Sequence, residues 1–335
     1  MRSVTVVIPA LNEAASLPRL LDDLARQTVS PGAVVVADAG STDGTRDIAA
    51  ARGAIVVDGG MPGVGRNAGA RVAATDLILF LDADVALEPD AIASMLEEFD
   101  RRGLAVASTF VEPLEREARY IFACEVVALY LDAMQYVAPR APGFCILIER
   151  SLHEAIGGFD ETLMLAEDHD YVERAAEHGK FRMMRSVHVR TSMRRIAKEG
   201  LVSLAFKYLY CELQVMAGRK IVDAPFEYEF AEFEAAGDEE HRSAARRMRE
   251  QLATAAEAVR AMSLESRTTL RELGETEIDS QLLSAALNRF RTEDVRSMEH
   301  YLRARGRLLR RRSKRMMAAA RTVAAGIRDE MRRSE

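Results

Sequence analysis

The N-terminal half of the chain alternates short apolar runs with segments whose apolar residues recur every three or four positions. Apolar runs rich in β-branched residues are typical of buried strands, and the second pattern is typical of helices with one buried face. We expect strands at residues 4–9, 33–38, 54–59 and 76–84, and helices at 16–26, 41–53 and 65–74. This alternation predicts an α/β domain whose mostly parallel sheet carries helices on both faces.

The pattern changes near residue 235. Beyond it, apolar residues recur at alternating spacings of three and four, which is typical of coiled-coil-like helices. This part holds 22 basic and 16 acidic residues and so carries a net charge of +6, against −12 for the part before it. We therefore predict an α/β domain over 1–235 and a helical, coiled-coil-like extension over 236–335.

The extension contains a basic run, 303–315, with eight Lys or Arg and no acid. A solvated helix face is the commonest meaning of such a run, and anionic lipid or an acidic partner surface are alternatives. Because no aromatic residues are interleaved with it, nucleic acid is not expected. Self-association through the helices or peripheral membrane contact remains open.

Cysteine usage and hydropathy indicate a location. The three cysteines are widely spaced and form no CxxC pair, which favours the reduced cytoplasm. The N-terminus does not resemble a signal peptide, and no run of about eighteen uncharged apolar residues occurs. The apolar stretch 201–218 contains Lys207 and Glu212, so we expect a core helix there, with a membrane interface or an acceptor pocket as alternatives. The chain is predicted to be cytoplasmic, with possible contact at the inner face of the membrane.

Acidic and amide side chains follow the predicted strands. Asn12 and Glu13 come after the first strand, Asp38 ends the second, and Asp82 and Asp84 end the fourth. Ligands of such sheets bind at the carboxyl ends of the strands, so these side chains are expected to share one edge. Paired carboxylates there suit Mg²⁺ or Mn²⁺ bridging a diphosphate, whereas solvated turn acids are the alternative reading.

A glycine-rich segment precedes the third helix. Gly63 and Gly65 would expose backbone amides near a helix N-terminus, and the guanidinium of Arg66 could join them in facing phosphate oxygens. An ordinary loop is the alternative, because a short Gly-x-Gly pattern is weak evidence on its own.

Six segments occur together in a characteristic order: VVIPALNEAASL, VVVADAGSTDGT, GVGRNAG, FLDADV, GGFDE and AEDHDYVERAAEHG. Over residues 4 to about 195 the chain thereby resembles family 2 glycosyltransferases of the GT-A fold. The resemblance implies that Pro9, Ala10, Asn12, Glu13 and Asp38 hold the nucleoside, that Gly63 and Arg66 lie near the nucleotide, and that Asp82, Ala83 and Asp84 carry the metal. Ala39 replaces the second acid of the usual DDGSTDGT, which leaves the recognised base open.

The resemblance also implies a reaction. Asp168 would be the general base that accepts the proton of an acceptor hydroxyl, and the neighbouring Glu167 would raise the pKa of Asp168 by repulsion. The expected enzyme is inverting and moves a sugar from a nucleoside diphosphate sugar, expected to be a UDP-sugar, to a lipid-linked, saccharide or small-molecule acceptor. Alternatives are helix capping by these acids, a retaining glycosyltransferase or nucleotidyltransferase, and a scaffold that binds sugar nucleotides without turnover.

The segment 182–200 reads as a last strand followed by a basic turn. His188 alternates with two valines, so it is a candidate third metal ligand, with a strand-surface histidine as the alternative. Arg194 and Arg195 are candidates for binding a phosphate of the donor or of an anionic acceptor.

Overall fold

The computed structural model describes residues 2–136 and 138–199, together with 204, 207–208, 211, 215 and 220–223. The predicted boundary at 235, the extension 236–335 and its basic run lie outside the described residues and stay predictions. Most of the apolar stretch 201–218 lies outside them as well. Among the helices that are described, none combines the length and apolarity needed to cross a bilayer.

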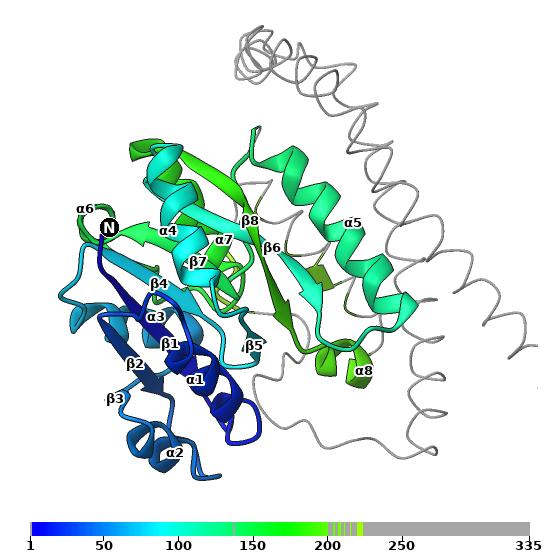
Figure 1. Ribbon diagram of the computed structural model, residues 1–335. Coiled ribbons are helices and arrows are strands. Elements are labelled where there is room, and N and C mark those ends of the chain that lie inside the picture. The colour runs from blue at the N-terminus through cyan, green and yellow to red at the C-terminus, as the bar shows by residue number, and fades with distance from the viewer. Residues whose placement is uncertain are drawn as a thin grey trace, which may run out of the picture.

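A single sheet forms the centre of the described part (Figure 1). Its strands are β1 Val4–Ala10, β2 Ala33–Asp38, β3 Ile55–Asp58, β4 Leu77–Leu81, β5 Val85–Ala86, β6 Val106–Pro113, β7 Cys145–Glu149 and β8 Phe181–Thr191, in the order β3-β2-β1-β4-β7-β6-β8-β5. The first four strands pair in parallel, as the sequence predicted. β7 runs antiparallel to both β4 and β6, so the sheet as a whole is mixed.

Helices cover both faces of the sheet, which confirms the predicted α/β class (Figure 1). They are α1 Leu17–Ala25, α2 Thr45–Ala51, α3 Pro62–Arg71, α4 Ala91–Arg101, α5 Ala118–Met134, α6 Arg150–Ala155, α7 Glu167–His178 and α8 Arg194–Glu199. One apolar core lies between the sheet and α1, α2 and α4, and a second lies between the sheet and α3, α5, α6 and α7. Burial on both faces explains why strands such as β4 are apolar at every position.

Two predicted elements differ in detail. The helix expected from residue 41 begins at Thr45, because residues 41–43 form a loop that bonds to the segment after β1. The predicted basic turn after β8 includes the short helix α8.

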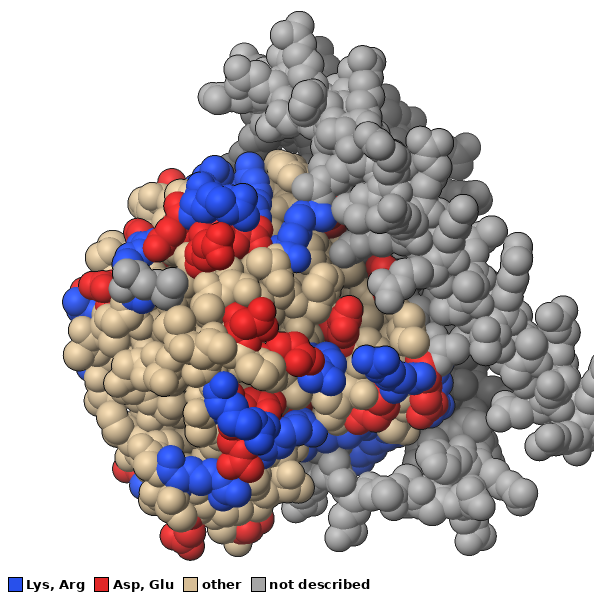
Figure 2. Space-filling model, in the orientation of Figure 1, with Lys and Arg blue, Asp and Glu red and all other residues tan. Residues whose placement is uncertain are grey.

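The carboxyl ends of β1, β2 and β4 meet at one edge, where β7 begins. Ala10 is in register with Asp38, and the N–H of Asp82 donates to the carbonyl of Phe144 at 3.1 Å. On the face in Figure 2, acidic and basic side chains lie next to one another in several clusters. The edge therefore gathers residues from four distant parts of the chain.

Candidate active site

Asp82 and Asp84 lie just beyond β4, with Ala83 packed into the core between them. Thr191 donates from Oγ1 to Asp84 Oδ1 at 3.3 Å. Burial, and then repulsion by Asp82, raise the pKa of Asp84 to about 6. Two carboxylates that repel each other in this way form a hard oxygen pair that a divalent cation would stabilise.

The described side chains do not form a complete metal site by themselves. Within the described part of the chain, no three His, Cys, Asp or Glu side chains gather as a metal site. Asp82 and Asp84 are thus a pair of carboxylates, and a metal-binding role for them stays a prediction.

Arg66 joins these acids to those of α7. Its side chain is 3% exposed, and Nη1 donates to Glu167 Oε1 at 2.7 Å. Nη2 donates to Asp82 Oδ1 at 3.0 Å and to the carbonyl of Gly143 at 3.2 Å. Both terminal nitrogens are thus engaged by protein oxygens. The predicted contact of Arg66 with phosphate stays a prediction.

Glu167 and Asp168 open α7, directly after Ala166, whose φ of 59° is in the left-handed region. Burial and the charge of Asp168 raise the pKa of Glu167, and Arg66 opposes both effects. Asp168 Oδ1 accepts the N–H of His169 at 2.8 Å. Glu167 is therefore paired with Arg66, and the predicted influence of Glu167 on Asp168 stays a prediction.

Asn12, Glu13 and Asp38 lie together where β1 and β2 end, as expected. The N–H of Thr42 donates to Asn12 Oδ1 at 2.9 Å, which ties the two loops together. Asp38 Oδ2 accepts the N–H of Ser41 at 3.2 Å. The other oxygen of Asp38 is buried and makes no hydrogen bond with the described residues. Such an atom is costly unless a ligand donates to it.

Pro9 and Ala10 close β1 and lie next to α3. A Cβ at Gly65 would lie 3.3 Å from Cβ of Pro9, so the helix approaches the strand closely. A Cβ at Gly63 would lie 3.6 Å from Cγ of Glu167, which places Gly63 on the α7 side of α3. The predicted nucleotide-binding residues therefore do come together at this edge.

Arg194 bridges the two ends of the site. Its guanidinium donates to Glu13 Oε1, and Nε lies 3.5 Å from Asp84 Oδ2. Arg195 hydrogen-bonds the hydroxyl of Tyr208, whose residue is half exposed, and the charge of Asp168 acts on that hydroxyl. Arg194 is thus committed to carboxylates, while Arg195 lies on the side of Asp168.

His188 lies beside Glu112, with Nδ1 at 3.7 Å from Oε1, and its ring centroid is 6.2 Å from that of Phe110. Thr191, which contacts Asp84, lies three residues further along β8, where side chains alternate between the two faces. A metal-ligand role for His188 stays a prediction.

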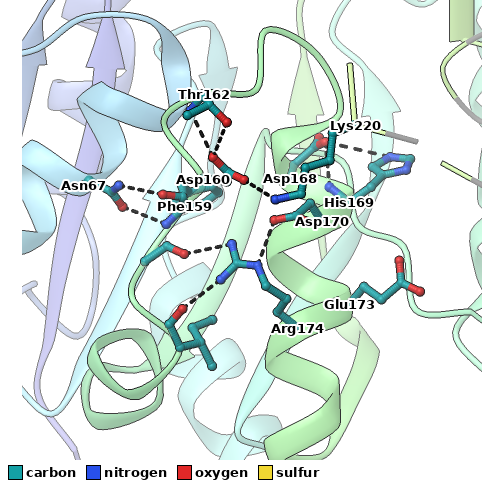
Figure 3. Close-up of polar contacts among 12 residues, drawn as sticks. Asn67, Phe159, Asp160, Thr162, Asp168, His169, Asp170, Glu173, Arg174 and Lys220 are labelled. Atoms are coloured by element: carbon teal, nitrogen blue, oxygen red, sulfur yellow. Dashed lines mark hydrogen bonds and ion pairs between the residues drawn. The ribbon is translucent and has the colours of Figure 1, made fainter. Parts of the chain in front are cut away.

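Three residues of the site were not predicted. Gly143 supplies a carbonyl to Arg66, and a Cβ there would lie 2.5 Å from Arg66 Nη2. Asn67 bonds both backbone groups of Phe159, at 2.9 Å and 2.8 Å (Figure 3). Phe159 then stacks on Tyr171 with centroids 3.7 Å apart. The signals for these residues were the glycine before β7 and the motifs GRNAG and GGFDE, none of which shows its partner.

The loop before α7 is also fastened from a distant part of the chain. Lys220 donates to Asp160 Oδ2 at 2.5 Å, and Asp160 Oδ1 accepts from Thr162 (Figure 3). The N–H of Met164 donates to the carbonyl of Ile221 at 2.9 Å. The turn that carries Glu167 and Asp168 is therefore supported on both sides.

The chain is similar in sequence to curated glycosyltransferases. The chain is 34% identical over 196 residues to the pre-mycofactocin glycosyltransferase of Mycobacterium tuberculosis, which is 53% of this chain and 40% of that protein. It is 42% identical over 103 residues to the validoxylamine A glucosyltransferase of Streptomyces hygroscopicus subsp. limoneus, which is 28% of this chain and 23% of that protein. The chain thus spans less than half the length of each relative.

Two solved structures are also similar. S. aureus TarS 1–349 in complex with UDP-GlcNAc superposes with a TM-score of 0.49 at 19% identity, over 67% of this chain and 68% of that one. The mannosyltransferase PcManGT from Pyrobaculum calidifontis, in complex with GDP-Man and Mn²⁺, gives a TM-score of 0.47 at 22% identity, over 62% and 64%.

The family model named Glycosyl transferase family 2 matches residues 5–156, which run from β1 to one residue beyond α6. This span includes Asp38, Arg66, Asp82 and Asp84, and the relatives are glycosyltransferases in their own right. Residues 5–156 are therefore similar to the glycosyl transferase family 2 domain.

Proposed function

We propose that this chain is a metal-dependent inverting glycosyltransferase that moves a sugar from a UDP-sugar to a hydroxyl or phosphate of an acceptor. The observation that carries the proposal is the meeting of two acid pairs at one sheet edge. Asp82 and Asp84 stand on one side, Glu167 and Asp168 stand on the other, and Arg66 contacts one acid of each pair.

The donor half would consist of the β1 and β2 ends and the acids after β4. The unpartnered oxygen of Asp38 would accept an N–H of the base. Asp82 and Asp84 would hold Mn²⁺ or Mg²⁺, which when bound would neutralise charge on the departing diphosphate. Asn12 and Glu13 would shape the nucleoside side of this half.

In the acceptor half, Asp168 would take the proton of the acceptor hydroxyl as that oxygen bonds to the anomeric carbon. The bond from that carbon to the diphosphate oxygen breaks on the opposite face, and the nucleoside diphosphate leaves with its electron pair. A single displacement of this kind inverts the anomeric configuration. A retained configuration in the product would favour the retaining alternative.

The acceptor side includes a cation. Arg195 hydrogen-bonds the Tyr208 hydroxyl, and the charge of Asp168 acts on that hydroxyl. A guanidinium near Asp168 supports an acceptor that carries a phosphate or carboxylate. Lipid-linked, saccharide and small-molecule acceptors all fit this chemistry. A cytoplasmic location is in keeping with the free cysteines Cys124 and Cys145; peripheral membrane contact and self-association stay predictions.

The test begins with nucleotide binding and donor hydrolysis. Wild-type protein would be mixed with UDP-glucose, UDP-GlcNAc or GDP-mannose, with and without Mn²⁺, and the thermal shift and release of nucleoside diphosphate would be measured. A ligand at 100 times its dissociation constant adds about 2.7 kcal/mol of stability. Binding without any turnover, with water or with acceptor mixtures, would favour the scaffold alternative.

Asp168→Asn then tests the base. The variant keeps the hydrogen-bond acceptor but cannot take a proton, so UDP binding should persist while turnover falls by about 10² to 10⁴. Asp170→Asn is the matched control, because Asp170 also lies in the first turn of α7 and pairs with Arg174 at 2.8 Å. Equal losses in both variants would assign the effect to the helix N-terminus and refute the base.

A further inference from the structure

Four parts of the chain converge on the side chain of Arg66. Its own helix α3 brings it under the edge, Asp82 comes from the end of β4, Gly143 from the segment before β7, and Glu167 from the start of α7. The partners are 16, 77 and 101 residues away in sequence. The convergence therefore depends on the tertiary fold and on a single guanidinium.

The guanidinium is held at both Nη atoms and beside an aromatic ring, while its Nε is buried without a hydrogen-bond partner among the described residues. Its carbon lies 5.4 Å from the centre of the Phe159 ring, and that ring stacks on Tyr171 of α7. The next residue, Asn67, holds the backbone of Phe159 at two points (Figure 3). With 3% of its side chain exposed, Arg66 has little surface left for a ligand.

We propose that Arg66 is a positioning residue: its two terminal nitrogens hold the metal-binding carboxylate Asp82 and the Glu167–Asp168 turn at one fixed separation. The inference rests on the proposed function, since it assigns Asp82 to the donor half and Asp168 to the acceptor half. Arg66 then acts on the reaction through these carboxylates and not by binding the donor phosphates.

The planar fork of arginine suits this role because its two Nη atoms reach two carboxylates in fixed directions. Lysine keeps the charge but offers one compact ammonium, so it satisfies one partner at a time. Methionine fills similar space without charge and leaves both carboxylates unpaired. A misplacement of about 1 Å in a site of this kind costs about 10²-fold in rate.

The experiment compares Arg66→Lys, Arg66→Met, Glu167→Gln and the double variant Arg66→Met with Glu167→Gln. Arg71→Met is the matched control, since Arg71 lies on the same helix, is 60% exposed and contacts only the carboxylate of Glu161 among the ion pairs described. Three quantities are measured: the affinity for UDP with Mn²⁺ by calorimetry, the affinity for Mn²⁺ alone by electron paramagnetic resonance, and UDP release from UDP-glucose.

A positioning role predicts that UDP affinity changes less than about threefold in Arg66→Met, while UDP release falls about 10²-fold. Mn²⁺ alone should bind more tightly, because the guanidinium no longer competes for Asp82. UDP release should also be slower in Glu167→Gln than in wild type. The double variant should release UDP no more slowly than Arg66→Met does, and Arg66→Lys should release it faster than Arg66→Met.

Two results would overturn the inference. A tenfold or greater loss of UDP affinity in Arg66→Met would make Arg66 a phosphate ligand. Losses that multiply in the double variant would show that Arg66 and Glu167 act independently. Thermal unfolding identifies a variant that has not folded, in which case Arg66→Lys and Glu167→Gln decide. A wild-type chain without Mn²⁺-dependent UDP binding would refute the proposed function instead.

Discussion

Gly143→Ala is the smallest change that tests how rigid the centre of the site is. The added Cβ would lie 2.5 Å from Arg66 Nη2 and 3.3 Å from Asp168 Oδ2. Gly143 is not among the described glycines with positive φ, so alanine meets no backbone strain there. The whole cost of the substitution therefore comes from the lack of space.

The magnitude follows from what must move. Arg66 is buried and holds Asp82, Glu167 and the Gly143 carbonyl, so withdrawing Nη2 breaks at least the bond to that carbonyl. Overpacking costs about 1–3 kcal/mol, and a hydrogen bond that involves a charged group contributes about 1.5–3 kcal/mol. We expect unfolding to become easier by about 3 kcal/mol.

Urea unfolding followed by far-UV circular dichroism measures this, since the chain has no tryptophan. With an m value of about 2–3 kcal/mol/M, the midpoint should fall by about 1 M. Gly63→Ala is the control: its Cβ would meet only ordinary contacts at 3.6 Å, and alanine within a helix should stabilise by up to about 1 kcal/mol. A Gly143→Ala midpoint equal to wild type would mean that Arg66 yields freely, and the reasoning about a rigid centre would fail.

Two further predictions concern pH and packing. The side chain of His153 is buried, and its Nδ1 lies 2.7 Å from the hydroxyl oxygen of Tyr171. Burial lowers the pKa of His153 to about 4. Because the unfolded chain binds this proton near pH 6.5 and the folded chain does not, stability should fall by roughly 3 kcal/mol between pH 6.5 and 4, and His153→Gln should flatten that window in urea titrations. Glu98 accepts the N–H groups of Arg185 and Ser186 at 2.8 and 2.7 Å, where β8 shifts register, and these bonds lower its pKa to about 2 against an opposing effect of burial. Glu98→Gln should cost about 2 kcal/mol at pH 7, and its difference from wild type should shrink as pH falls from 4.5 toward 2; a difference constant with pH would refute a role for the charge.

Much of the fold could be predicted because its signals are local. The apolar runs of β1, β2 and β4 and the spacing of α1 depend on residues close in sequence, so β1, β2 and α1 were predicted to within one residue, whereas β4 ends three residues before the predicted end at 84. The antiparallel place of β7 was not predictable, since nothing in residues 145–149 states which neighbour they pair with. The same holds for the register shift in β8.

The site was predictable as a set of residues and not as a set of contacts. The acids at strand ends lie at one edge because parallel strands bring them there. Glycines and a helix start around Arg66 predicted a phosphate contact, which stays a prediction, but they gave no sign of its partners Asp82 and Glu167, which lie 16 and 101 residues away. Ion pairs between residues so far apart in sequence depend on how the elements pack, and a local sequence pattern does not predict that packing.

The direction of β7 has a consequence for how the two halves of this edge could vary. Because β7 runs against β4, its beginning lies at the same edge as the ends of β1, β2 and β4, and everything inserted between β6 and β7 enters and leaves there. Under the proposed function, residues up to β4 supply most of the donor half, and residues from β6 onward supply the acceptor half together with Arg194, which reaches back to Glu13 and Asp84. Related chains could therefore exchange the later half, and with it the acceptor, while the earlier half stays unchanged, provided that a carboxylate remains within reach of Arg66, which couples the two halves.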